Sequence, residues 1–160
     1  MREGRKKEFA AFHAEGEAPD PQSEATFNGS KLQWELSKTG NHGQLRAFYR
    51  ELLRLRRELP ALARLDNASL SATVIAPGVL ELRRWCDGNR VVAWLNFAAE
   101  PATVAVEPGA GPWNRQLDAA DPPWGGAGST LPPKLADGAI PATINLPPYG
   151  VAVYTSDVPS

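Results

Sequence analysis

The chain has 160 residues, 42% hydrophobic and 22% charged, a composition typical of a globular protein with one or two domains. Its formal net charge of −1 offers no large basic surface, which argues against nucleic acid and acidic membranes as partners. No apolar run is long enough to span a bilayer, the charged N-terminus lacks a signal-peptide core, and one cysteine allows no internal disulfide, so we expect a cytoplasmic protein.

The first 40 residues predict little regular structure. Residues 2–12 suit a short helix, because Phe9 and Phe12 are three positions apart and share one face. Residues 13–39 are polar and irregular, contain two prolines and two glycines, and show no sustained hydrophobic period. A loop of this length in a compact domain is usually functional, disordered, or separated from the structure that orders it.

Residues 41–62, NHGQLRAFYRELLRLRRELPAL, predict an amphipathic helix. Apolar side chains recur at steps of three and four and form a stripe along one face: Leu45, Phe48, Tyr49, Leu52, Leu55 and Leu59, widened by Leu53. Asn41 is the expected N-cap, and Pro60 is expected to end the helix at Leu59. The stripe is wide, so we expect most of its packing partner to lie outside this chain.

After residue 63 the hydrophobic period changes to two, which predicts β-strands. The strand-like segments are residues 70–76, 79–85, 90–98, 102–107, 142–146 and 150–156. Segment 90–98 is apolar on both faces and is therefore expected at the centre of a sheet, whereas the Pro- and Gly-rich residues 108–138 form a long excursion. The predicted fold is mainly β: an antiparallel β-sandwich preceded by a long loop and one amphipathic helix.

Three stretches resemble a known family. GRKKEFAAF, followed by PDPQSEATFNGSKLQW, is similar to a region near the C-terminus of the maltooligosyltrehalose trehalohydrolases, a family of the α-amylase superfamily. FYRELLRLRRELPAL resembles the last barrel helix of many α-amylase-type enzymes and is less specific. The final strands, which include LPPYGVAVY, resemble the C-terminal all-β domain of these enzymes.

The resemblance implies two parts: residues 1–62 as the loop and terminal helix of a truncated (β/α)8 barrel, and residues 63–160 as a C-terminal all-β domain. It also implies a C-terminal fragment of a glycoside hydrolase that releases trehalose from maltooligosyltrehalose, with a structural role for the fragment. The catalytic carboxyl groups of the family lie on earlier barrel strands. The expected partner is therefore the catalytic barrel of the parent enzyme, and the stripe over residues 45–59 offers self-association as an alternative.

Few residues suit chemistry. Retaining glycoside hydrolysis needs two carboxylates about 5–5.5 Å apart on rigid elements. The dense acids of the N-terminal half, Glu15, Glu17 and Asp20, lie instead in the predicted loop, so we predict no catalytic residue in this chain. The two histidines, His13 and His42, have no second ligand at metal-binding spacing, and we predict neither a metal nor another cofactor.

Five tryptophans suggest sugar binding, because flat aromatic rings stack on pyranose faces. Trp85 and Trp94 lie in predicted strands and are expected in the core. Trp113 and Trp124 lie in the excursion and are candidates for an exposed platform, although packing beneath the loop is favoured.

Three residues of the N-terminal loop are further candidates for contact with an α-glucan in the parent enzyme, on loop position alone. The complete set of candidate substrate-binding residues is Asp20, Gln22, Phe27, Trp113 and Trp124. Two alternative functions remain open: a stand-alone carbohydrate-binding module for α-glucans, and a small β-sandwich interaction domain.

Overall fold

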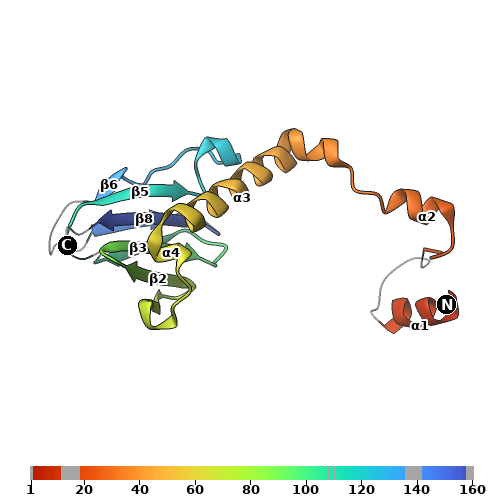
Figure 1. Cartoon of the computed structure of the whole chain (residues 1–160), viewed down its shortest axis with the longest axis horizontal. Coiled ribbons are helices and arrows are strands. Elements are labelled where there is room, and N and C mark those ends of the chain that lie inside the picture. The colour runs from red at the N-terminus through yellow and green to blue at the C-terminus, as the bar shows by residue number, and fades with distance from the viewer. Residues whose placement is uncertain (1, 12–18, 108, 110, 136–141, 158–160) are drawn as a thin grey trace. The chain divides into compact units, whose positions relative to one another are not determined.

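The computed structural model describes residues 2–11, 19–107, 109, 111–135 and 142–157 (Figure 1). The chain divides into two compact units, Met1–Ser37 and Lys38–Ser160. The division at residue 62 follows from the resemblance alone and stays a prediction.

The N-terminal unit is helical where the sequence predicted mostly irregular structure. Helix α1 (Arg2–Ala11) confirms the short helix, although Phe12 and His13 lie outside the described residues. Helix α2 (Glu24–Gly29) and the 3-10 helix η1 (Trp34–Lys38) were not predicted. Helix α2 begins because the Ser23 hydroxyl accepts a hydrogen bond from the backbone of Ala25 (3.2 Å), and six residues are too few to show a hydrophobic period.

The predicted amphipathic helix is confirmed as α3 (Gly40–Glu58). Its N-cap is Thr39, so the prediction of Asn41 is wrong by two positions. The difference arises because the backbone N–H of Gly43 already donates to the carbonyl of Thr39 (3.0 Å), which closes the first turn there. The helix ends at Leu59 as predicted, and Pro60 opens the short helix α4 (Pro60–Ala63), where its missing N–H costs little.

The rest of the second unit is an antiparallel β-sandwich, which confirms the predicted fold class. Its described strands are β1 (Leu70–Ala76), β2 (Val79–Cys86), β3 (Asn89–Asn96), β4 (Ala102–Val106), β5 (Trp113–Asp118), β6 (Lys134–Leu135), β7 (Ala142–Leu146) and β8 (Val151–Asp157). Two 3-10 helices, η2 (Asn67–Ser69) and η3 (Pro122–Trp124), lie between them. One sheet has the order β1-β2-β3-β8-β5-β6, and the smaller sheet pairs β4 with β7.

Strand β5 is the main difference from the sequence prediction, since it lies in the excursion and pairs with β8 on one side and β6 on the other. The pairing of β5 with β8 shifts register between Arg115 and Leu117, as at a β-bulge. Trp113 and Leu117 therefore face opposite sides of the sheet, which hides the period of two that reveals a strand.

The core between the two sheets is built from inward-facing residues of both. Its central pair is Trp94 and Tyr154, whose rings meet edge to face with centroids 5.5 Å apart. The Tyr154 hydroxyl donates to the carbonyl of Pro132 (2.7 Å), and burial raises the pKa of Tyr154 to about 12. Trp85 of β2 points to the same side of the larger sheet as Trp94. It is nevertheless 43% exposed, which contradicts the prediction that it is buried. We attribute this to the smaller sheet, whose two strands cover only part of the larger one.

The opposite face of the six-stranded sheet is covered by α3 and α4 (Figure 1). Leu55 packs there with Val91 and Val153, so strand β3 is buried on both faces, as its sequence predicts. The backbone N–H of Ala61 donates to the side chain of Asn89 (3.1 Å) and joins α4 to the sheet. The sheet thus covers one side of the apolar stripe, with Leu55 as the buried residue of α3, and the expectation that most of the partner lies outside this chain stays a prediction.

Candidate functional site

The candidate site is the side of α3 that the sheet leaves uncovered. Leu55, on the covered side, is 2% exposed, whereas Leu45, Tyr49 and Leu53 are all more than half exposed. These three residues are spaced by four positions and stack along one line of the helix, here called the docking row. A row of large exposed apolar side chains is typical of an interaction surface.

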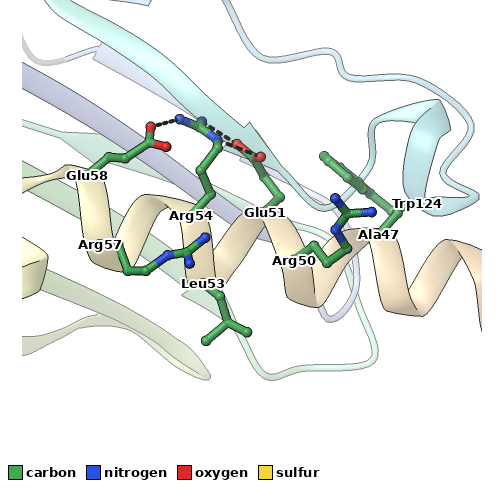
Figure 2. A pocket seen from close by; sticks show the side chains of 8 residues that line it. All are labelled: Ala47, Arg50, Glu51, Leu53, Arg54, Arg57, Glu58 and Trp124. Carbon is green, nitrogen blue, oxygen red and sulfur yellow. Dashed lines mark hydrogen bonds and ion pairs between the residues drawn. The ribbon is translucent and has the colours of Figure 1, made fainter.

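Next to the docking row, charged side chains line a shallow groove of about 570 Å³ on the outer face of α3 (Figure 2). Arg54 donates to both carboxylate oxygens of Glu51, from Nε to Oε2 (2.9 Å) and from Nη2 to Oε1 (2.5 Å), and it also binds Glu58. Arg50 and Arg57 project from the same face, and neither forms an ion pair with the residues that the structure describes. The acids of this face are thus neutralised, and the remaining charge is positive.

We expect the Glu51–Arg54 pair to make stability depend on pH. The hydrogen bond from Arg54 lowers the pKa of the Glu51 carboxyl below its ordinary value. A carboxyl with a lower pKa in the folded chain stabilises the fold above the unfolded pKa and loses that contribution as the pH falls through the folded pKa. Glu51→Gln should therefore lower the melting temperature by about 1–3 °C at neutral pH, as expected of a partly exposed pair, and the difference should shrink below about pH 4.

Thermal unfolding followed by circular dichroism at several pH values measures this difference. Glu58→Gln removes the more exposed partner of Arg54, so it is the control and should have a smaller effect. A melting-temperature difference that stays constant from neutral to acidic pH would show that the Glu51 charge contributes nothing.

Two of the predicted sugar-binding residues belong to the packing of the second unit. Trp113 is 2% exposed in the core between the sheets, and its indole N–H donates to the carbonyl of Gly109 (3.2 Å). Its ring is therefore not an exposed platform. Trp124 is half-buried, meets Phe48 edge to face with centroids 5.7 Å apart, and donates its indole N–H to the carbonyl of Asp118 (2.9 Å). Trp124 thus joins η3 to helix α3.

The other three predicted residues lie in the N-terminal unit. The carboxylate of Asp20 accepts a hydrogen bond from the backbone N–H of Gln22 (3.0 Å), which shapes the turn that precedes α2. Phe27 is an exposed residue of α2, and the ammonium group of Lys31 lies 4.7 Å from its ring centroid. The role of these residues in glucan contact stays a prediction.

The structure also places residues that the sequence did not single out. Asp118, at the end of β5, is 1% exposed and accepts hydrogen bonds from the Ser129 hydroxyl and from the backbone of Ala120 (2.8 Å). Arg115 donates to Ser129 and to the carbonyl of Leu131 (2.6 Å), and its Nη1 lies 3.7 Å from the Asp118 carboxylate. This polar cluster fastens the segment after β5. No local motif predicts it, because Arg115 reaches Ser129 and Leu131 across 14 and 16 positions of irregular chain.

Among the described residues, no group of three or more His, Cys, Asp and Glu side chains is arranged to hold a metal ion. None of the described helices combines the length and apolarity needed to cross a membrane.

Comparison with known proteins gives consistent similarities. The family model described as a domain of unknown function (DUF3459) matches residues 67–134. Malto-oligosyltrehalose trehalohydrolase from Deinococcus radiodurans is 43% identical over 106 residues, which are 64% of this chain and 17% of that protein. The protein of the same name from Rhizobium sp. strain M-11 is 41% identical over 103 residues, again 64% of this chain and 17% of that protein.

A solved structure of a candidate alpha amylase from Salmonella typhimurium is also similar, with a TM-score of 0.65 and 26% identity. The similarity covers 98% of this chain and 23% of that one. The chain therefore spans only about a sixth of the length of the two curated relatives that it matches.

Proposed function

We propose a function from the premise that this chain resembles the C-terminal part of the malto-oligosyltrehalose trehalohydrolases, glycoside hydrolases of the α-amylase superfamily. The chain acts as the C-terminal accessory part of such an enzyme. In the whole enzyme, the α-1,4 bond next to the terminal trehalose unit of maltooligosyltrehalose is hydrolysed by carboxyl groups of the catalytic barrel. The contribution of this chain is structural, and alone it releases no trehalose.

The docking row is the observation that supports this proposal. The sheet already covers Leu55 and its neighbours on α3, so the fold of the second unit does not require Leu45, Tyr49 and Leu53 to be apolar. Exposed apolar area costs solubility and is stabilising only when it is covered, by roughly 25 cal/mol per Å². We assign the catalytic barrel as the partner that covers it, because the curated relatives contain a much longer polypeptide than the region matched here.

Charge is compatible with the same partner. Arg50 and Arg57 line the groove together with Leu53 of the docking row. The matching surface of the barrel should therefore carry acidic side chains opposite these two arginines. In the same proposal, Asp20, Gln22 and Phe27 of the N-terminal unit contact the α-glucan in the whole enzyme. Their contribution would be to substrate binding, since the bond-breaking groups belong to the barrel.

Reconstitution of a two-chain enzyme tests the proposal. The Deinococcus radiodurans relative, shortened to end before the region matched by this chain, is co-expressed with the chain, and trehalose release from maltooligosyltrehalose is measured. We expect the two polypeptides to co-purify and to release trehalose. Tyr49→Ala combined with Leu53→Ala should weaken their association at least about tenfold, the factor that corresponds to ~1.4 kcal/mol of lost contact.

Val74→Ala is the matched control, because Val74 is a strongly exposed apolar residue of β1 outside the docking row, and its truncation should leave association unchanged. Trehalose release by the chain alone would refute the structural role. A chain that purifies as a dimer, and becomes monomeric on Tyr49→Ala and Leu53→Ala, would assign the docking row to self-association instead.

A further inference from the structure

Tyr149 combines an exposed aromatic ring with an unfavourable backbone conformation. It lies in the turn between β7 and β8, where the backbone N–H of Gly150 donates to the carbonyl of Pro147 (3.0 Å). Tyr149 is the third residue of this four-residue turn, has a φ of +54°, and is 68% exposed. This position normally selects glycine, and a bulky residue there is an outlier that suggests a use for its side chain.

The ring of Tyr149 stands beside a hollow of about 500 Å³, a volume within the range of small-molecule sites. One wall is the turn of Tyr149 with its two prolines, and the other is the end of β5 with the segment that follows it, residues 118–120, 126–128 and 130. The polar side chains exposed in it are Thr130 and Asn145. The Thr103 hydroxyl donates to the amide oxygen of Asn145 (2.7 Å) and so fixes the direction of that amide.

The far wall of the hollow is rigid in its own right. The backbone N–H of Gly128 donates to the carbonyl of Ala120 (2.9 Å), which ties the beginning of the segment to its later part. A Cβ atom on Gly126 would lie 2.0 Å from the same carbonyl, so the two backbones are in direct contact. The buried carboxylate of Asp118 holds the segment from beneath. A ligand would therefore meet a preformed site.

We propose that this hollow is a secondary subsite for a linear α-1,4-glucan. The ring of Tyr149 stacks on the apolar face of one glucose unit, and Thr130 and Asn145 exchange hydrogen bonds with its hydroxyl groups. The choice of an α-glucan rests on the proposed function, whereas the ring, the hollow and the two polar side chains are features of the second unit itself. In this proposal the aromatic ring of the second unit that contacts the sugar is the exposed ring of Tyr149, and not the buried ring of Trp113.

Calorimetric titration of the full chain with maltoheptaose tests the subsite. We expect measurable binding that falls at least about tenfold for Tyr149→Ala and stays within about threefold for Tyr149→Phe, which keeps the ring. Thr130→Val preserves shape, removes one hydroxyl and should weaken binding without abolishing it. Cellohexaose, a β-1,4-glucan of similar size, should bind at least about tenfold more weakly than maltoheptaose.

Tyr149→Gly separates binding from folding. It removes the ring and places glycine at a position that favours it, so we expect the melting temperature to rise while maltoheptaose binding is lost. Absence of binding by the unsubstituted chain, equal binding by Tyr149→Ala, or equal affinity for cellohexaose would each overturn the subsite.

The outcome is independent of the reconstitution experiment. A chain that restores trehalose release but does not bind maltoheptaose would leave the accessory role intact and remove the subsite. A chain that binds maltoheptaose through Tyr149 but does not associate with the barrel would leave the subsite intact and remove the accessory role.

Discussion

Leu55→Ala should lower the free energy of unfolding by about 2–5 kcal/mol, whereas Leu53→Ala should change it by less than about 0.5 kcal/mol. The two leucines are two positions apart on α3, but Leu55 is buried against the sheet and Leu53 is 56% exposed. Truncating Leu55 removes its contacts with Val91 and Val153 and leaves a cavity, because the sheet beneath cannot move to fill it. Leu53 is more than half exposed, so its truncation removes few contacts within this chain.

Urea unfolding followed by tryptophan fluorescence measures both values, and an unchanged slope shows that the extent of unfolding is the same. The order should reverse in the association assay, where Leu53→Ala weakens binding of the barrel and has little effect on the fold. Equal losses of stability for the two variants would mean that α3 is not seated on the sheet through Leu55.

Asp118→Ala should lower the free energy of unfolding by about 3 kcal/mol or more, as expected when one partner of a buried charged cluster is removed. Its carboxylate accepts hydrogen bonds from Ser129 and Ala120, and the guanidinium group of Arg115 lies beside it. Without the carboxylate, the part-buried Ser129 hydroxyl loses its acceptor, and the largely buried guanidinium of Arg115 loses one of the two carboxylates beside it. Asp118→Asn keeps the shape and one acceptor oxygen and should cost less than the alanine variant.

Asp121→Ala is the matched control. Asp121 also lies 3.7 Å from the Arg115 guanidinium, but its side chain is more exposed, so its removal should cost less than about 1 kcal/mol. Limited proteolysis provides a second measurement: Asp118→Ala should be cut faster than Asp121→Ala in the segment after β5, because that segment loses its anchor. Equal stability of the two variants would contradict the role assigned to the buried carboxylate.

The elements with an uninterrupted period were predictable. Segment 90–98 is apolar on both faces and became β3, the strand buried on both sides, and the stripe of residues 41–62 became α3. Strand β5 was not predictable, since the irregularity between Arg115 and Leu117 reverses the alternation within six residues. Helix α2 was missed for a different reason, because it is shorter than two turns and depends on the cap at Ser23.

The candidate site was predictable only in part. The sequence indicated that α3 carries more apolar surface than a small domain needs, but it could not tell which column of that surface the sheet covers. The tryptophans show the same limit: Trp85 lies in a strand but is exposed, and Trp113 lies in the excursion but is buried. Burial is decided by the size of the opposing layer and by the bulge, which are both properties of the assembled fold.

The position of β8 has a consequence for the order of synthesis. The strand is the last described element of the chain, yet it lies between β3 and β5 in the middle of the larger sheet. One side of it supplies Tyr154 to the space between the sheets, and the other supplies Val153 to the surface that seats α3. On a ribosome, neither layer can close until β8 emerges, so α3 gains its complete support only after this strand has been translated.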